Sequence, residues 1–179
     1  MKNILKFAFI LFFVNLIAAS ILASTYNATK GRIEEQIRLA QEQALKQVMP
    51  EKIADRTEAV EKDSAIKYWK AFKGDNPQVR GYIFIAKKYG YSSVIETMVG
   101  VEKDGTITGL KVISHNETPG LGAKITESPF LKQFINRDID GLELSKNGIH
   151  AITGATISSR ALLDSIKSGG MEMLGGKNE

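Results

Sequence analysis

The chain has 179 residues, with 24 lysines and arginines against 20 acidic residues and no cysteine. The absence of cysteine excludes a disulfide framework, cysteine-ligated iron–sulfur clusters and thiol catalysis. The formal net charge of +4 includes Lys2 and Lys6 near the N-terminus, and no basic run is interleaved with aromatic residues, so nucleic-acid binding has no support.

The segment from Ile4 to Ala23 predicts a membrane anchor. It contains no acid, and its only base is Lys6. Twenty helical residues at about 1.5 Å each span about 30 Å, the thickness of a bilayer hydrocarbon core. A cleaved signal peptide is the alternative, with Ala18-Ala19-Ser20 as its processing site, but the run exceeds the roughly 7–15 apolar residues of such signals. We therefore predict an uncleaved transmembrane anchor over residues 1–24.

Residues 25–64 are expected to form a helical stalk and linker. From Arg32 to Val48, apolar residues recur at helical spacing between polar ones, and Pro50 is expected to end this helix. The stretch from Glu51 to Ser64 is highly charged and predicts a loop or a further helical turn.

A globular domain is expected over residues 65–174, beginning with an antiparallel meander. β-Favouring residues predict four strands, at 66–72, 79–87, 94–101 and 107–114. Gly74-Asp75-Asn76-Pro77 and Asp104-Gly105 are turn signals, and the second predicts a hairpin. The fold class that follows is α+β: a mainly antiparallel sheet with packed helices, preceded by one N-terminal transmembrane helix.

The rest of the domain predicts short elements and one longer helix. Thr126 or Ser128 is expected to cap a short helix with Pro129 in its first turn. An apolar strand is expected at 148–152, and a final helix at 157–174 with Ser158 or Ser159 near its cap. Gly169-Gly170 is expected to break or fray that helix, and residues 175–179 to form a flexible tail.

Two blocks carry the functional signal: His115-Asn116-Glu117-Thr118-Pro119-Gly120-Leu121-Gly122 and Thr153-Gly154-Ala155-Thr156. The second puts a hydroxyl beside small residues where a helix starts, a geometry that suits a phosphate because N–H groups and the helix dipole converge there. The alternative for this second block is an ordinary strand-to-helix turn, in which the glycine bends the chain and a threonine caps the helix. The first block is either a tight connection after a strand or a loop whose amides face a planar heterocycle.

Other site types have little support in these residues. His115 and His150 are the only histidines, and without an obvious carboxylate partner they make a poor metal site. Thr156, His115 and Glu117 are residue types that could serve as the nucleophile, base and orienting group of a hydrolase. Their spacing in the sequence does not require such an arrangement. We therefore predict neither catalytic nor metal-ligating residues in this chain.

Taken together in this order, the anchor, Asp104-Gly105 and the two blocks resemble the FMN-binding subunits of bacterial ion-pumping respiratory complexes. The resemblance covers nearly the whole chain. It is strongest to the G subunit of the Rnf electron-transport complex, and second to the C subunit of the sodium-translocating NADH:quinone reductase. It implies an electron-carrying subunit of an ion-translocating ferredoxin:NAD oxidoreductase complex, rather than a complete enzyme.

The resemblance also implies the cofactor, the location and the partners. FMN would be joined through a phosphoester to Thr156 by a separate flavin transferase. The protein would be single-pass in the bacterial inner (cell) membrane, in contact with lipid, with its soluble domain on the periplasmic or extracytoplasmic side and the other members of the complex as partners.

The residues expected to hold this cofactor lie in and near the two blocks. Thr153, Gly154 and Ala155 would surround the phosphate, and Lys124 carries a charge that suits a reduced, anionic flavin. The residues expected to contact the flavin ring are Glu117, Thr118, Leu121 and Gly122. The family usually has Asp three residues before the first residue of the second block, where this chain has His150. The substitution concerns a position at which the flavin transferase is expected to recognise its target.

Two alternative functions stay open at this stage. One is a membrane-anchored binding or scaffold module without redox activity. The other is a stand-alone extracytoplasmic flavin electron carrier, which shares the cofactor and differs in its partners.

Overall fold

The computed structural model describes residues 2–62 and 65–175. It contains two compact units, Met1–Ala40 and Gln41–Glu179. In the first unit, helix α1 (Lys2–Val48) exposes a run of large apolar side chains, and by length and composition it can cross a membrane. The expected helix over 32–48 is confirmed as the continuation of α1, which ends two residues before Pro50. The segments expected to form the anchor and the stalk are therefore parts of one helix.

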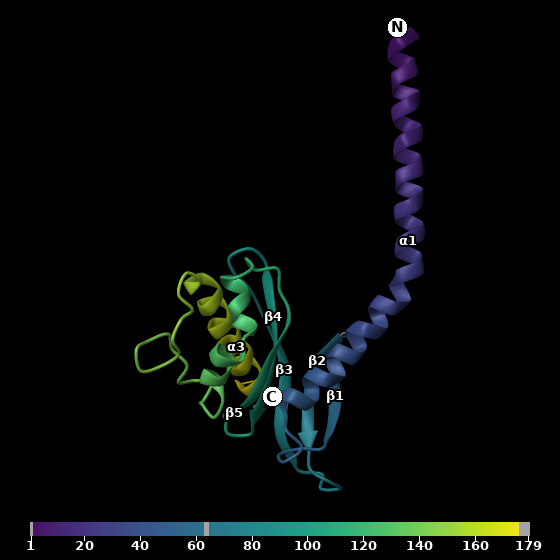
Figure 1. The fold of residues 1–179 in the computed structure, drawn as a ribbon. Helices are drawn as coiled ribbons and strands as arrows, with labels where there is room; N and C mark the ends of the chain where they lie inside the picture. Colours follow the sequence, from purple (N-terminus) through teal and green to yellow (C-terminus); the bar gives the residue numbers. More distant parts are fainter. Residues whose placement is uncertain (1, 63–64, 176–179) are drawn as a thin grey trace. The chain divides into compact units, whose positions relative to one another are not determined.

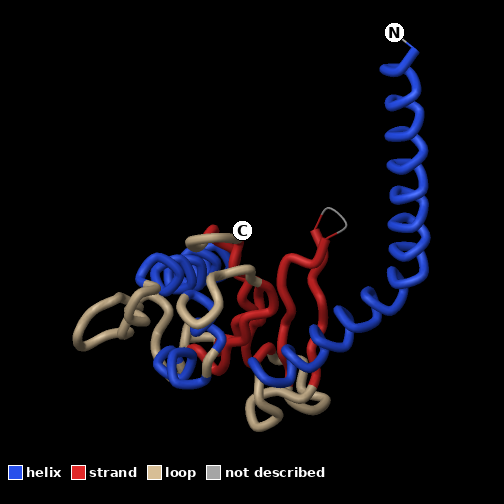
Figure 2. The backbone as a smooth tube through the Cα atoms, turned by 45° about the horizontal axis from the view of Figure 1, so that its top comes forward, coloured by secondary structure: helices blue, strands red, loops and turns tan. Residues whose placement is uncertain are grey.

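The second unit is built on a five-stranded antiparallel sheet. Its strands are β1 (Arg56–Lys62), β2 (Ala65–Phe72), β3 (Val79–Tyr89), β4 (Val94–Glu102) and β5 (Ile107–Ser114), paired in sequence order. The four expected strands are thus confirmed, and Gly105 turns the β4–β5 hairpin with a φ of 96°. Figure 2 shows the strands in red.

Strand β1 corrects the expectation of a loop or helical turn between Glu51 and Ser64. It pairs antiparallel with β2 at the edge of the sheet, and residues 56–59 are exposed. An exposed edge strand tolerates charged residues on both faces, and such charges oppose pairing with other chains. Because β1 and the end of α1 belong to the second unit, this unit begins well before the expected domain start at Ala65.

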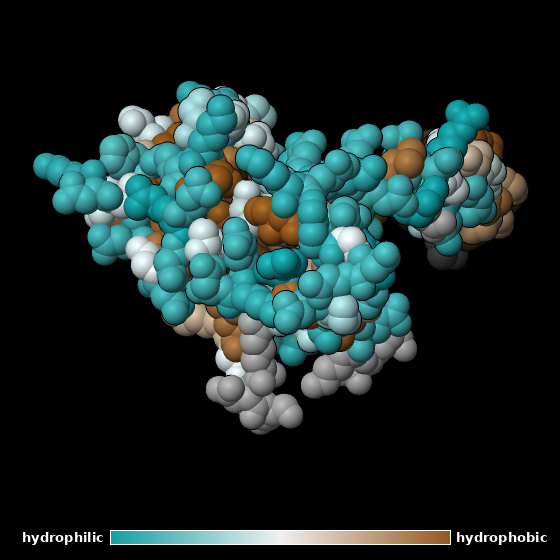
Figure 3. Space-filling model, turned by 90° about the horizontal axis from the view of Figure 1, so that it is seen from below, coloured by the Kyte–Doolittle hydropathy of each residue, from teal (hydrophilic) through white to brown (hydrophobic). Residues whose placement is uncertain are grey.

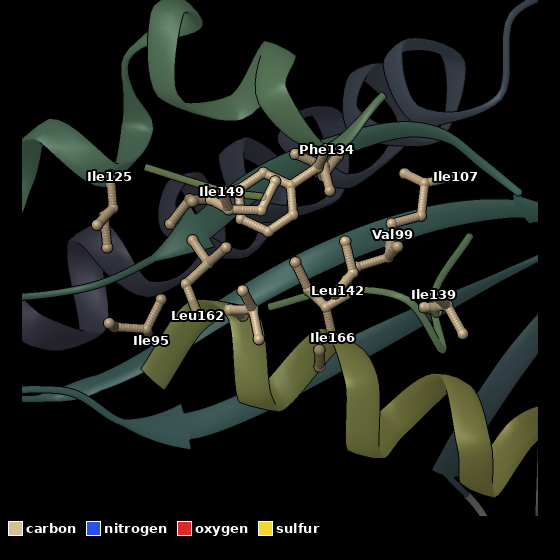
Figure 4. Close-up of a cluster of buried hydrophobic side chains, with 14 of the residues drawn as sticks. Ile95, Val99, Ile107, Ile125, Phe134, Ile139, Leu142, Ile149, Leu162 and Ile166 are labelled. Atoms are coloured by element: carbon tan, nitrogen blue, oxygen red, sulfur yellow. The ribbon is translucent and has the colours of Figure 1, made fainter. Parts of the chain in front are cut away.

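Apolar side chains cover both faces of the sheet. On one face, Phe84, Val99 and Leu110 belong to a buried cluster with Leu162 and Ile166 of helix α3 (Thr156–Gly175). Figure 4 shows part of this cluster, and Figure 1 shows α3 beside strands β3 to β5. A second cluster packs the last turns of α1 against β2, β3 and β4, and its members include Ala44, Val48, Trp69, Ile83 and Met98. The face of the molecule drawn in Figure 3 is mainly hydrophilic.

The last turn of α1 lies directly on two glycines of the sheet. A Cβ added to Gly100 would lie 2.2 Å from the carbonyl oxygen of Val48, and one added to Gly109 would lie 2.7 Å from the Val48 Cα. The Thr108 hydroxyl donates a hydrogen bond to that same carbonyl oxygen at 2.6 Å. Backbone packed on backbone at this point fixes the end of α1 to the sheet.

Replacing Gly100 by alanine is therefore expected to lower the free energy of unfolding by about 1–3 kcal/mol, because the new methyl group overpacks against the main chain. Denaturant unfolding of the full chain in detergent measures this change. Gly141→Ala is the matched control, since its nearest neighbour would be the Asp138 carbonyl oxygen at 3.7 Å. Equal stability of the two variants would contradict the close approach.

Helix α3 does not break at Gly169-Gly170, contrary to expectation. A Cβ on Gly170 would lie 2.1 Å from the Ile139 Cδ1, and one on Gly169 would lie 2.8 Å from a ring carbon of Phe84. The two glycines let the helix approach the core, and this packing outweighs a helix-propensity cost of about 1 kcal/mol for each. Gly175 is the last residue of α3, and residues 176–179 of the expected tail lie outside the described residues.

Three smaller expectations also need correction. Ser158 and Ser159 are buried within α3 and do not cap it. Only an isolated bridge between Leu144 and Ile149 forms where a strand was expected at 148–152. The short helix α2 (Ser128–Leu131) has Pro129 in its first turn, as expected, but no side chain caps it. It lies between the 3-10 helices η1 (Gly122–Thr126) and η2 (Lys132–Phe134).

Candidate functional site

A hollow of about 570 Å³ opens where three segments of the second unit meet. These segments are the β3–β4 turn, the loop after β5 and the start of α3. Its volume lies within the range of small-molecule sites, about 300–1,000 Å³. The residues that line it are Tyr91, Thr118, Leu121, Gly122, Gly154, Ala155, Thr156, Ile157 and Ser158.

The start of α3 supplies one wall. Gly154 has a φ of 80°, a left-handed conformation that glycine adopts without strain, and the Ala155 N–H donates to the Ile152 carbonyl oxygen at 2.9 Å to close the turn. Thr156 is the first residue of the helix and is exposed. The first N–H groups of a helix have no intrahelical acceptor, so this end of α3 attracts an anion.

The loop after β5 supplies a second wall. The N–H groups of Leu121 and Ala123 both donate to the Thr118 carbonyl oxygen, at 3.2 and 3.1 Å, and Gly120 has a φ of 76°. This bend presents Leu121, 46% exposed, to the hollow. A Cβ on Gly122 would lie 2.9 Å from a carboxylate oxygen of Glu117, so glycine is required for this packing.

Glu117 does not line the hollow, but its side chain connects the three segments that form it. Its side chain is buried, at 4% exposure. One oxygen accepts the N–H groups of Ser92 and Ser93, at 3.0 and 3.1 Å. The other accepts the Tyr91 N–H at 3.2 Å and the Ser158 hydroxyl at 2.5 Å. A single carboxylate therefore binds the β3–β4 turn and the start of α3 to its own loop.

These bonds also control the charge of Glu117. Burial by itself raises the pKa of this carboxyl, because a charge loses solvation in the interior. Hydrogen bonds from the Ser158 hydroxyl and the three backbone N–H groups outweigh that effect and lower the pKa below its usual value. The group is therefore a carboxylate at neutral pH, and it accepts hydrogen bonds from all of these donors.

The structure brings most of the predicted site residues together. Thr118, Leu121, Gly122, Gly154, Ala155 and Thr156 all line the hollow. Thr153 is exposed beside it but is not part of the lining. Glu117 does not line the hollow, and internal donors occupy its carboxylate, so its contact with the flavin ring stays a prediction. Lys124 is exposed and does not line the hollow.

Tyr91, Ile157 and Ser158 line the hollow and were not predicted. Tyr91 comes from a hairpin turn remote in sequence, and no local pattern links it to the other two blocks. Ile157 could have been found from the sequence, because it is an apolar residue outside the apolar stripe of the final helix. In the structure it is 56% exposed. Ser158 was expected only as a cap.

The hydrolytic arrangement is not formed. Thr156 lines the hollow, whereas His115 does not, and the His115 Nδ1 accepts the N–H of Glu117 at 3.2 Å. Its role in this structure is to shape the turn.

Comparison with known proteins connects this site to a family. Residues 90–169 match the FMN-binding domain family, and residues 1–48 match the RnfG N-terminal region. The G subunit of an ion-translocating oxidoreductase complex from Methanosarcina acetivorans is 33% identical, over 93% of this chain and 93% of that protein. The chain belongs to the G-subunit family of ion-translocating oxidoreductase complexes.

A second G subunit supports the same family, and a solved structure has the same fold. The G subunit of the Na(+)-translocating ferredoxin:NAD(+) oxidoreductase complex of Acetobacterium woodii is 32% identical, over 92% of this chain and 89% of that protein. The structure of the C subunit of the Na(+)-translocating NADH-quinone reductase from Parabacteroides distasonis matches with a TM-score of 0.58 and 18% identity. The match covers 79% of this chain and 94% of that one, which confirms the α+β fold.

The matched FMN-binding region contains the whole hollow. It begins at Gly90, next to Tyr91, and ends at Gly169, beyond Ser158. The resemblance inferred from the two sequence blocks is therefore confirmed at the level of the family.

Proposed function

We propose that this member of the G-subunit family is a membrane-anchored electron carrier with FMN covalently attached to Thr156, working within an ion-translocating ferredoxin:NAD oxidoreductase complex. The position of Thr156 carries the proposal. This residue stands exposed at the N-terminus of a 20-residue helix and on the wall of a ligand-sized hollow. Relatives named as subunits of such complexes support the assignment to this reaction.

The residues of the hollow fit FMN. Tyr91, Leu121 and Ile157 expose apolar surface around it, which suits the flat isoalloxazine ring. The absence of a Cβ at Gly154 and the free end of α3 suit the phosphate. The flavin, when bound, supplies reversible electron transfer, and the protein holds it in place.

Attachment requires one new bond to this chain. The Thr156 Oγ1 would bond to the phosphorus of an activated flavin nucleotide, while the bond from that phosphorus to its leaving group breaks. The hydroxyl proton would pass to a base of the flavin transferase, and no electrons are transferred. Exposure of Thr156 gives that enzyme access. Thr153, Gly154 and Ala155 would then flank the phosphoester.

Membrane attachment completes the proposal. Helix α1 would anchor the chain in the bacterial inner (cell) membrane, in contact with lipid, with the second unit on the extracytoplasmic side. A covalent link would prevent loss of FMN from a compartment where free FMN is scarce. The other subunits of the complex would be its electron-transfer partners.

Mass spectrometry of the intact chain tests the proposal. Protein matured in its native host, or co-expressed with an active flavin transferase, is expected to be heavier by one FMN less one water. Its flavin fluorescence is expected to survive denaturation. A bare polypeptide despite an active transferase would refute covalent attachment and favour a scaffold module. Purification without other members of the complex would favour a stand-alone carrier.

A further inference from the structure

A second hollow, of about 400 Å³, lies between the start of α3 and the loop that precedes it. We call it the basic hollow, because Lys146, His150 and Arg160 contribute to it. Of the described residues that line it, none is acidic, and the complete set is Leu144, Ser145, Lys146, Ile149, His150, Ala151, Thr156 and Arg160. Among the described residues that line the first hollow, by contrast, none is charged.

Thr156 connects the two hollows. It is the one residue, within the described part of the chain, that lines both of them. A nucleotide attached at its hydroxyl therefore has two different environments within reach. FMN likewise has two different parts, an uncharged aromatic ring and an anionic phosphate.

We propose that the basic hollow is the phosphate subsite for the flavin nucleotide attached at Thr156, while the uncharged hollow receives the ring. This inference rests on the proposed attachment of FMN. It assigns to this chain a set of phosphate contacts in Lys146, His150 and Arg160, beyond the Thr-Gly-Ala-Thr block itself.

The geometry of α3 supports the role of Arg160. It follows Thr156 by four residues, and side chains at this spacing lie on the same face of a helix, one turn apart. Guanidinium and ammonium groups form strong, charge-assisted hydrogen bonds to phosphate oxygens. In the described part of the chain, neither Arg160 nor Lys146 forms a salt bridge, whereas Lys87 and Lys88 do. The positive charge of the hollow is therefore not neutralised internally.

His150 is held in place by two contacts outside its own turn. Its N–H donates to the Gln133 Oε1 at 2.8 Å, and the Gln133 Nε2 donates to the His150 carbonyl oxygen at 3.3 Å. Its ring Nε2 lies 2.9 Å from the Lys146 carbonyl oxygen and must donate to it, because a carbonyl oxygen only accepts. The ring Nδ1 is then the atom left for a ligand. In its protonated form this atom donates, which suits a phosphate oxygen.

Ser145 adds an unsatisfied polar atom at the same place. It lines the basic hollow, and its buried Oγ has no hydrogen-bond partner among the described residues. Buried hydroxyl groups normally have a partner. An anion in the hollow would supply the acceptor that this hydroxyl lacks.

Phosphorus NMR of the flavinylated full chain tests this inference. The double variant Lys146→Gln/Arg160→Gln is expected to shift the ³¹P resonance of the phosphoester relative to the wild type, because two cations near its oxygens are lost. The charge-retaining variant Lys146→Arg/Arg160→Lys is expected to restore most of the wild-type position. Lys111→Gln, an exposed lysine on β5 outside both hollows, is the matched control and should leave the resonance unchanged.

The outcomes separate the two proposals. An unshifted resonance in a flavinylated double variant would overturn the phosphate subsite and leave the attachment at Thr156 intact. A wild-type protein that carries no phosphoester at all would overturn both. Circular dichroism of each variant checks that a shift does not arise from unfolding.

Discussion

Thr156→Ala is expected to abolish covalent flavin completely while the fold survives. The variant removes the only atom proposed to bond to phosphorus, and no neighbouring hydroxyl has the same position at the start of α3. Because Thr156 is exposed, its loss creates no cavity, and the free energy of unfolding should change by less than about 1 kcal/mol. Fluorescence on a denaturing gel and intact mass measure the loss.

Two controls give this prediction its specificity. Thr57→Ala removes an exposed hydroxyl from the edge strand β1, outside both hollows, so flavin attachment should persist. Thr156→Ser keeps the hydroxyl and should retain at least part of the attachment. Denaturation-resistant fluorescence in Thr156→Ala would show that FMN is bound elsewhere and would refute the assignment.

Glu117→Ala is expected to lower the free energy of unfolding by about 3 kcal/mol or more, because each buried donor left without an acceptor costs about 1–3 kcal/mol. The Ser158 hydroxyl and three backbone N–H groups would lose their acceptor, and the β3–β4 turn would separate from the start of α3. Since both segments line the hollow, flavin incorporation should fall as well. Denaturant unfolding and in-gel fluorescence measure the two effects.

Glu117→Gln keeps the size of the side chain and removes its negative charge, so it measures how much of the stability depends on the carboxylate. The amide has the same size but offers one acceptor oxygen in place of two, so its NH₂ group must face a donor at one of the two positions. We expect an intermediate loss, about 1–3 kcal/mol. Glu127→Gln, an exposed acid, is the control and should change stability by less than about 0.5 kcal/mol. A Glu117→Gln protein as stable as the wild type would show that the network contributes little.

The same residue predicts a pH dependence. The folded-state pKa of Glu117 is lowered, so its contribution to stability is fully present above the unfolded pKa of about 4.3 and is lost as the pH falls through the folded value. Wild-type unfolding followed from pH 6 downward should show this loss, and Glu117→Gln should lack that component. A pH profile common to both proteins would contradict the lowered pKa.

Local patterns were sufficient for most of the sheet. Strands β2 to β5 were predictable because runs rich in β-favouring residues are bounded by turn residues, and strands covered on both faces need few polar positions. Strand β1 was not, because an exposed edge strand buries few side chains and leaves no apolar signal in Arg56–Lys62. The predicted helix break at Gly169 and Gly170 was wrong for a related reason. These glycines make room for Phe84 and Ile139, which are distant in sequence.

The fold class, the apolar N-terminal helix and the two blocks that line the hollow were predictable from the amino-acid sequence, since each depends on residues close together in the chain. The role of Glu117 became visible only in the folded protein, because its donors lie 24 to 41 residues away. The tertiary structure alone placed Thr156 between an uncharged and a basic hollow. A carboxylate takes its function from whichever donors the fold brings to it, and no pattern of neighbouring residues contains that information.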